Sequence, residues 1–207
     1  MTAGAPAQAM TDEYGRGPSL HGNQVNFAEP VRQRGFTVWL TGLSGAGKST
    51  VACALEAQLA AAGHHATVLD GDVLRGRLNR DLGFSPADRR ENIRRAAEVA
   101  RLMNDAGLIV IGAFISPQQA DRALARQIIG DELFIETWIS TPGAVCEQRD
   151  PKGLYRKARA GLIAEFTGVS APYEAPLQPA LTLDTSTVPL EQSCRLLLAH
   201  LAPRLRK

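Results

Sequence analysis

A glycine-rich stretch follows the first strongly apolar segment of the chain. The pattern G-x-x-x-x-G-K-[ST] is matched without a gap by Gly42-Leu43-Ser44-Gly45-Ala46-Gly47-Lys48-Ser49. Glycines let successive backbone N–H groups point at phosphate oxygens, and a helix that begins near Lys48 adds the positive end of its dipole. Lys48 supplies a cation for the β- and γ-phosphates, and the Ser49 hydroxyl is suited to coordinating Mg²⁺. The motif therefore predicts a site for a nucleoside triphosphate.

Two carboxylates stand where an acceptor group would be needed. Asp70 and Asp72 close an apolar, strand-like segment, and Arg75 follows three residues later. In an open α/β sheet, ligands bind outside the carboxyl ends of the strands, so these acids would face the reacting groups. One is suited to holding hydrated Mg²⁺, with Asp70 acting through water, and the other to orienting or deprotonating an acceptor hydroxyl. The alternative interpretation is an acidic turn that caps a helix.

A sheet must position these residues. Five short apolar segments alternate with helical stretches, a pattern that indicates parallel strands joined by right-handed crossovers. The segments are Phe36–Thr41, Ala66–Leu69, Leu108–Phe114, Leu133–Ser140 and Ala180–Asp184. The guanine-selecting pattern Asn-Lys-x-Asp does not occur in the sequence, which favours a compact kinase of small molecules. We therefore expect a three-layer α/β P-loop kinase fold, with a central parallel sheet of about five strands flanked by helices.

One helix is well marked at both ends. Ser85 is a suitable N-cap, Pro86 suits the first helical position, and Asp88 completes a capping-box arrangement. An apolar stripe at helical spacing then continues until Gly107. On the flank of this helix Arg89 and Asn92 stand one turn apart, so both can reach the same ligand.

Composition narrows the class of protein. The 207 residues include 44% hydrophobic residues, and 23 Lys and Arg against 21 Asp and Glu give a net charge of only +2. That charge disfavours a protein that binds nucleic acid mainly through basic residues, and no apolar run is long enough to cross a membrane. The first residues show no secretory signal, and the three widely spaced cysteines indicate buried thiols in a reducing compartment. We expect a cytoplasmic protein without nucleic-acid or membrane partners.

The chain resembles the adenylylsulfate kinase family. The resemblance is carried, in family order, by TVWLTGLSGAGKST (37–50), DGD (70–72), RDLGFSPADRRENIRR (80–95), FISP (114–117), RDPKGLYRKARAG (149–161), FTG (166–168) and APYEAP (171–176). It implies transfer of the γ-phosphate of ATP to the 3′-hydroxyl of adenosine 5′-phosphosulfate (APS), giving 3′-phosphoadenosine 5′-phosphosulfate (PAPS) and ADP. It also implies Mg²⁺ as cofactor, a homodimer, and ATP sulfurylase as a functional partner.

The resemblance implies roles for individual residues. Catalysis would fall to Lys48, Asp72, Asp70 and Ser116. ATP would be bound by residues 42–50, Thr50 included, together with Arg149, Lys152 and Thr185. Phe84 and Phe166 would stack on the two faces of the APS adenine, although packing in the core is the alternative for each ring. The other residues that would bind APS are Asp72, Arg75, Arg89, Asn92, Ile115, Ser116 and Lys152. Surface ion pairing is the alternative for the two arginines, and a solvated helix position for Asn92.

Ser116 follows the third predicted strand. We expect it to be the N-cap of the next helix, where free N–H groups bind an anion. Members of the family are often described as phosphorylated at this serine. A phosphate loop, Mg²⁺ and a well-placed acceptor suffice for direct in-line transfer, so we interpret any such phosphorylation as secondary.

A basic segment punctuated by Gly and Pro precedes the last predicted strand. Taken alone, it reads as a solvated basic helix, but the resemblance favours a mobile lid over residues 149–171 whose closure would bring Lys152 to the phosphates and exclude water. Thr185, after the last strand, would line the ATP adenine pocket. The domain organisation predicted is a disordered tail over residues 1–34 and a catalytic domain over 35–207.

The sequence departs from the family pattern beside the two acids. The family usually continues Asp-Gly-Asp with Asn, where this chain has Val73, and Gly76 and Arg77 replace the usual His-Gly order. Two alternatives to APS phosphorylation stay open at this point. One is a catalytically weak nucleotide-binding partner or regulator, and the other is a P-loop kinase of a different small hydroxyl acceptor.

Overall fold

The structure, a computed structural model, describes residues 33–206. Most of the tail expected over residues 1–34 lies outside the described residues. A single five-stranded sheet with strand order β2-β3-β1-β4-β5 forms the centre, and every neighbouring pair of strands is parallel. The strands are β1 (Phe36–Thr41), β2 (Ala66–Asp70), β3 (Ile109–Ala113), β4 (Phe134–Ile139) and β5 (Leu181–Leu183). The five predicted strands and their parallel arrangement are confirmed.

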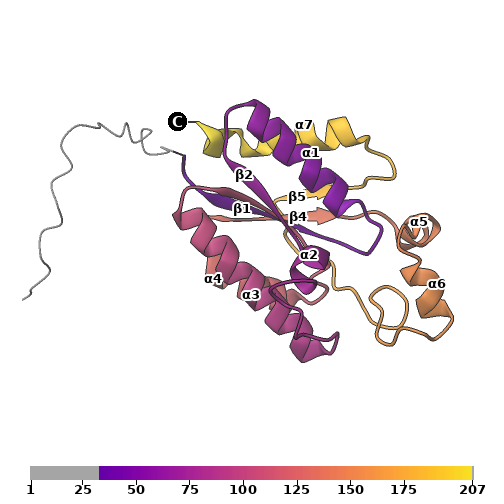
Figure 1. Cartoon of the computed structure of the whole chain (residues 1–207). Helices are drawn as coiled ribbons and strands as arrows, with labels where there is room; N and C mark the ends of the chain where they lie inside the picture. The colour runs from indigo at the N-terminus through magenta and orange to yellow at the C-terminus, as the bar shows by residue number, and fades with distance from the viewer. Residues whose placement is uncertain (1–32, 207) are drawn as a thin grey trace, which may run out of the picture. The chain divides into compact units, whose positions relative to one another are not determined.

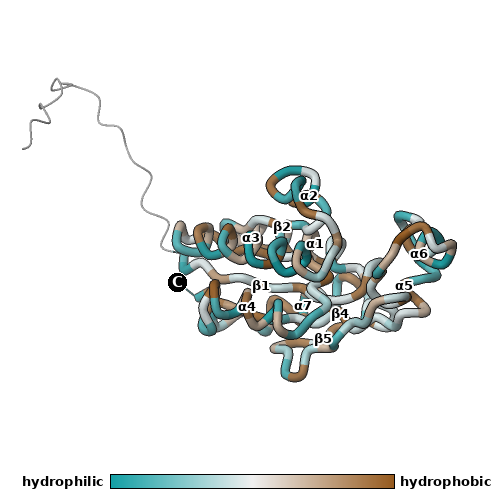
Figure 2. The backbone as a smooth tube through the Cα atoms, turned by 90° about the horizontal axis from the view of Figure 1, so that it is seen from below, coloured by the Kyte–Doolittle hydropathy of each residue, from teal (hydrophilic) through white to brown (hydrophobic). Residues whose placement is uncertain are grey.

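Helices cover both faces of the sheet (Figure 1). On one face α1 (Lys48–Ala61) packs with α7 (Leu190–Leu205), and on the other α3 (Pro86–Asp105) packs with α4 (Gln119–Ile129). In Figure 2, the tubes of α3 and α4 change repeatedly between hydrophilic and hydrophobic residues along their length, as expected for helices that bury one side. Three short helices complete the fold: α2 (Gly71–Arg75), α5 (Gly143–Arg149) and α6 (Leu154–Arg159).

Two hydrophobic cores lie on the two faces of the sheet. All six residues of β1 are buried, as a central strand covered by helices on both faces requires. Val38 and Leu40 join the core under α1 and α7, whereas Trp39 joins the core under α3 and α4. There the Trp39 ring stacks on Phe114 with a centroid separation of 4.5 Å. The strand that precedes the glycine-rich loop is therefore fixed from both sides.

Half of the predicted capping box of α3 is present, because Ser85 caps the helix but the Asp88 carboxylate accepts the Ser85 hydroxyl instead of the Ser85 backbone N–H. The Ser85 hydroxyl accepts a hydrogen bond from the Asp88 backbone N–H at 3.2 Å and donates one to the Asp88 carboxylate at 2.8 Å. The helix therefore starts at Pro86 and runs for 20 residues. This start determines the position of the Arg89 and Asn92 side chains one turn later.

One prediction about the cysteines is wrong. All three thiols are free, and Cys146 and Cys194 are buried, but Cys53 is exposed. The core-facing side of α1 consists of Val51, Ala52, Leu55 and Leu59. Cys53 follows Ala52 in the sequence but lies outside this buried face, because successive helix residues are rotated by about 100° about the helix axis. Its side chain is therefore exposed to solvent.

Candidate active site

The glycine-rich loop joins the end of β1 to the start of α1. Gly45 and Gly47 adopt positive φ angles of 76° and 99°. A Cβ atom at Gly45 would lie 2.7 Å from the carbonyl oxygen of Cys146, so the loop has no room for a side chain there. α1 then begins at Lys48, and its free N–H groups lie at the end of the loop, as predicted. The loop can hold phosphate oxygens with backbone amides and the positive end of a helix.

Lys48 folds back over this loop. Its Nζ atom donates hydrogen bonds to the carbonyl oxygens of Gly42 at 2.9 Å and Leu43 at 2.7 Å. The side chain is buried, and the loss of solvation lowers the pKa of Lys48 to about 8, although Cys146, Asp72 and Asp70 act in the opposite direction. A triphosphate would restore the full positive charge because its negative charges favour the protonated amine.

The two predicted acids meet the loop at the carboxyl end of β2. Asp70 is the N-cap of α2, since its carboxylate accepts a hydrogen bond from the Asp72 N–H at 2.9 Å. Its second oxygen accepts the Ser49 hydroxyl at 2.6 Å. Asp72 forms an ion pair with Lys152. The carboxylates therefore combine the two interpretations of the sequence: one caps a helix, and both face the phosphate loop.

A cavity of about 1000 Å³ extends from the loop to the start of α3. Most of the predicted site residues line it: Ser44, Gly45, Gly47, Lys48, Ser49, Thr50, Asp70, Asp72, Arg75, Phe84, Arg89, Asn92, Ile115, Ser116, Lys152 and Phe166. The fold thus brings together around one cavity predicted site residues that are more than 100 positions apart in the sequence. The volume falls at the upper end of the range typical of small-molecule sites.

The two predicted stacking rings differ in exposure. Phe84 is 59% exposed, whereas Phe166 is 7% exposed and meets Tyr155 edge-on at 5.0 Å. The guanidinium groups of Arg75 and Arg89 lie 4.5 and 5.7 Å from the centre of the Phe84 ring. Phe166 therefore combines the core position and the cavity position that the sequence left as alternatives, and Phe84 belongs to the cavity wall alone.

The two arginines at Phe84 are held by backbone carbonyls. Arg75 donates to the carbonyl of Gly83 at 2.8 Å, and Arg89 donates to Phe84 at 2.9 Å and to Glu165 at 3.0 Å. Within residues 33–206 neither forms a salt bridge, so the surface ion pair that the sequence allowed is not what places them. Partial burial lowers the pKa of both arginines. Two cations beside an apolar ring suit an anionic, aromatic ligand.

Asn92 is buried rather than solvated. Its side-chain oxygen accepts a hydrogen bond from the Asn79 amide at 3.0 Å, and the residue lines the cavity beside Ile93. The alternative of a solvated helix position is therefore wrong for Asn92.

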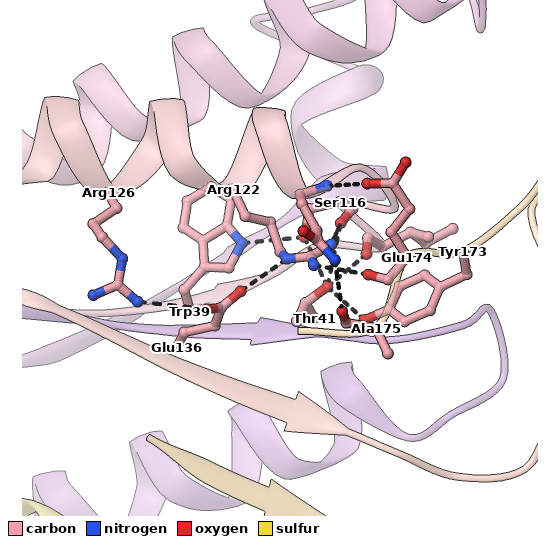
Figure 3. Close-up of polar contacts among 11 residues, drawn as sticks. Trp39, Thr41, Ser116, Arg122, Arg126, Glu136, Tyr173, Glu174 and Ala175 are labelled. Carbon is pink, nitrogen blue, oxygen red and sulfur yellow. Dashed lines mark hydrogen bonds and ion pairs between the residues drawn. The ribbon is translucent and has the colours of Figure 1, made fainter. Parts of the chain in front are cut away.

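The predicted helix-capping role of Ser116 is also wrong. α4 starts at Gln119, and its N-cap residue is Gln118. Ser116 itself is buried at a positive φ of 36°, donates to the Thr41 hydroxyl at 2.9 Å, and accepts from the Trp39 indole N–H at 3.2 Å (Figure 3). Since its hydroxyl is bound to β1 and the next two residues are not helical, the helix begins three residues later than Ser116.

The basic segment 149–171 lies beside the phosphate loop. Arg149 donates to the hydroxyl and the carbonyl of Thr185 at 2.8 and 2.9 Å. Thr185 in turn donates to the carbonyl of Ala46 at 2.8 Å. A second cavity, of about 390 Å³, lies on this side of the loop and is lined by Gly45, Gly47, Thr50, Val51, Arg149, Pro151, Thr185, Val188, Pro189 and Leu190. Thr185 and Arg149 therefore lie away from the acceptor side, at the outer edge of the loop.

Sequence reasoning missed a buried ionic cluster beside Ser116. Arg122 and Glu136 pair at 2.8 Å, and both are buried. A signal for it was present, because Glu136 interrupts the apolar strand Phe134–Ile139 and a charge inside a covered strand requires a partner. Tyr173 was missed as well, and its hydroxyl lies 2.9 Å from that of Thr41.

The fold and the phosphate loop define a P-loop kinase of a small acceptor. A sequence profile of the family described as adenylylsulphate kinase matches residues 34–184. The adenylyl-sulfate kinase of Shewanella amazonensis is 54% identical over 184 residues, which cover 87% of this chain and 93% of that protein. The chain therefore belongs to the adenylylsulfate kinase family.

Solved structures agree with this assignment. The Mycobacterium tuberculosis APS kinase CysC in complex with AMPPNP and APS is 49% identical, with a TM-score of 0.80 over 82% of this chain and 99% of that chain. The hexameric APS kinase from Thiobacillus denitrificans is 34% identical with a TM-score of 0.64, and the match covers 84% of this chain and 30% of that one.

Proposed function

We propose that the protein transfers the γ-phosphate of ATP to the 3′-hydroxyl of APS, giving PAPS and ADP. The observation that carries this proposal is the shared cavity, in which the phosphate loop, Asp72 and the Phe84 ring line one continuous space. The family membership supports the choice of acceptor, as does the solved relative with a nucleotide analogue and APS bound.

The residues divide the chemistry between them. Residues 42–50 hold the ATP phosphates, and Lys48 neutralises the charge that develops on the transferring group. Asp72 accepts or orients the proton of the acceptor hydroxyl, and Lys152 exchanges its ion pair with Asp72 for contacts with the phosphates. Arg149 and Thr185 bind the ATP base side. Ser116 contributes by shaping the cavity wall, and transfer to APS is direct.

APS occupies the acceptor side of the cavity. Its adenine stacks between Phe84 and Phe166, and Arg75 and Arg89 pair with the phosphosulfate. Asn92 and Ile115 line the remaining wall. These assignments rest on where the side chains lie and on the resemblance of the motifs.

Mg²⁺ is the proposed cofactor beside ATP. The Ser49 hydroxyl and the Asp70 carboxylate are 2.6 Å apart at the phosphate loop and offer oxygen ligands, which Mg²⁺ prefers. Ser49 would bind the ion directly and Asp70 through water. Bound there, Mg²⁺ would neutralise part of the negative charge of the triphosphate.

We also propose the domain organisation and the setting of the enzyme. Residues 35–207 form the catalytic domain, preceded by a tail over 1–34, and residues 149–171 act as a lid.

The free thiols support a reducing, cytoplasmic location, and within residues 33–206 no helix is long and apolar enough to span a bilayer. ATP sulfurylase would supply APS, and a homodimer is supported only by the self-association of a hexameric relative.

An acceptor panel tests the proposal. The purified protein would be given Mg-ATP with APS, gluconate, shikimate or a nucleoside, and ADP and the phosphorylated product would be measured. We expect turnover of order 1 s⁻¹ or faster with APS and none with the others. Turnover with another acceptor and none with APS would show that the acceptor is wrong, and tight APS binding without transfer would show a non-catalytic binding module.

A further inference from the structure

Arg122 is a buried cation outside the phosphate loop, and its guanidinium group donates hydrogen bonds to three different segments of the chain. It lies in the first turns of α4 and is 3% exposed. Its Nε atom donates to the Glu136 carboxylate at 2.8 Å, and its two terminal nitrogens donate to the carbonyl oxygens of Ser116 and Glu174, each at 2.7 Å (Figure 3). One guanidinium group therefore joins α4, β4, the loop after β3 and the segment near residue 174.

The contact with Ser116 fixes a wall of the acceptor cavity. Ile115, Ser116 and Pro117 line that cavity, and Ser116 adopts a positive φ of 36° that a residue with a side chain rarely occupies. Such a conformation persists only where surrounding contacts hold it. The Arg122 bond to the Ser116 carbonyl is one of these contacts, beside the bonds of the Ser116 hydroxyl to Thr41 and Trp39 and a longer bond of 3.4 Å from the Thr41 hydroxyl to the Ser116 carbonyl.

The contact with Glu174 fixes the segment that follows Phe166, and Phe166 lines the acceptor cavity as Ser116 does. The N–H of Glu174 donates to the carbonyl of Pro117 at 2.9 Å, and its carboxylate accepts the N–H of Gln119 at 2.7 Å. Residues 173–175 follow the Phe166 segment by only a few positions. Arg122 is thus bonded to both chain segments that border the acceptor space, one that carries Ser116 and one that leads back to Phe166.

Stability alone is a weak explanation for this arrangement. A buried ion pair contributes little net stability, because removing two charges from water costs about as much as their attraction returns. The guanidinium group also places three donors on three separate segments, a geometry that a single ammonium group cannot reproduce. The arrangement is suited to fixing the relative positions of those segments.

We propose that Arg122, held by Glu136, is a positioning residue for the acceptor nucleotide. It sets the separation between the Ser116 wall and the chain leading to Phe166, and thereby the width of the space that APS enters. This inference rests on the proposed function. It predicts an effect on the acceptor that is not shared by ATP, because Arg122 touches no residue of the phosphate loop.

The test compares Arg122→Lys with Arg126→Gln. Arg126 contacts the same Glu136, at 3.4 Å, but forms no hydrogen bond to Ser116 or Glu174, so Arg126→Gln is the matched control. Steady-state kinetics with APS and with ATP would be measured, together with Tm and with APS binding by calorimetry without ATP. We expect Arg122→Lys to raise the KM and the Kd for APS about tenfold, with the KM for ATP within twofold of wild type. Arg126→Gln should leave the KM and the Kd for APS and the KM for ATP unchanged.

A more disruptive substitution at the same position extends the series. Arg122→Gln should weaken APS binding more than Arg122→Lys, which keeps the charge and one donor group. If Arg122→Gln does not fold, Arg122→Lys decides the outcome, and Tyr173→Phe provides a second, milder perturbation of the same segment.

Two results would overturn the inference. One is an equal rise in the KM for ATP and for APS, and the other is a fall in Tm with unchanged APS affinity, since either would assign Arg122 a purely structural role. A failure of the proposed function looks different, because the wild-type protein itself would then neither bind nor phosphorylate APS.

Discussion

The two ends of the main cavity are built differently. At the phosphate end Lys48 is only 9% exposed and donates to the carbonyl oxygens of Gly42 and Leu43, directly after the fully buried strand β1. At the acceptor end Phe84 is 59% exposed, and Arg75 and Arg89 reach backbone carbonyls of loops. The first end is formed in advance by the sheet, and the second is formed by side chains that can rearrange around a ligand.

This difference predicts how substitutions divide between kcat and KM. Groups that are fixed before binding and aimed at the transferring phosphate act mainly in the transition state, so their loss lowers kcat. Exposed groups that grip the acceptor act in the ground state and the transition state alike, so their loss raises KM.

The largest effect is expected for Lys48→Ala. Removing the cation that donates to the carbonyl oxygens of Gly42 and Leu43 should lower kcat by about a hundredfold or more, because the developing phosphate charge loses its counter-ion. Arg195→Ala, which removes an exposed cation of α7, is the control and should keep wild-type kcat. A loss below tenfold for Lys48→Ala, measured by steady-state kinetics, would contradict the assignment.

Asp72→Asn should also lower kcat by about a hundredfold, because the amide cannot accept the proton of the acceptor hydroxyl. The same change breaks the ion pair with Lys152, so Lys152→Ala must be measured beside it. If Asp72→Asn costs less than tenfold in kcat, another group assists the hydroxyl.

The stacking rings test the acceptor end. Phe84→Ala and Phe166→Ala should each raise the KM for APS, since base stacking contributes roughly 1 to 3 kcal/mol. They should differ in Tm, because Phe166 packs against Tyr155 in the core whereas Phe84 is exposed. An unchanged KM for APS in Phe166→Ala would return this ring to a purely structural role.

A smaller effect is expected for Ser116→Ala. The hydroxyl lies between Thr41 and Trp39, so its loss should disturb the cavity wall while kcat stays within about tenfold of wild type. Loss of all activity in a variant that still folds and binds APS would instead indicate a phosphoserine intermediate.

The smallest effect concerns stability. Asp121 is fully buried, and within residues 33–206 neither carboxylate oxygen has a hydrogen-bond partner. Burial raises the pKa of Asp121, so the folded protein holds this proton to a higher pH than the unfolded chain, and the charged form destabilises the fold at neutral pH. Asp121→Asn should therefore raise Tm at pH 8 by about 2 to 4 °C.

The gain from Asp121→Asn should disappear as the pH falls. Below the ordinary Asp pKa of 3.8 the carboxyl is protonated in both states, and the amide then offers no advantage. Thermal unfolding of both proteins between pH 4 and 8 measures this trend. A gain that is equal at all pH values would show that folding does not raise the pKa of Asp121.

Much of the architecture could be read from local patterns. The strand ends, the phosphate loop and the Ser85 cap of α3 depend on neighbouring residues, and the sequence placed the loop and the cap correctly and the strand ends to within one residue. These features also put Lys48, Asp70 and Asp72 at one edge of the sheet, because parallel strands end on the same side.

The features that local sequence patterns did not predict depend on contacts between residues far apart in the chain. The start of α4 was misplaced because Ser116 bonds to β1, 75 residues earlier, instead of capping the helix. Arg122 and Glu136 are 14 residues apart on different elements, and only the fold shows that they meet. The exposure of Cys53 likewise follows from which face of α1 the sheet covers.

A crystal structure of this protein with AMPPNP and APS would test the central claim most directly. We predict the analogue's phosphates in the loop of residues 42–49, the APS base between Phe84 and Phe166, and the 3′-hydroxyl against Asp72. An APS molecule bound elsewhere, or an Asp72 carboxylate turned away from the sugar, would contradict the account.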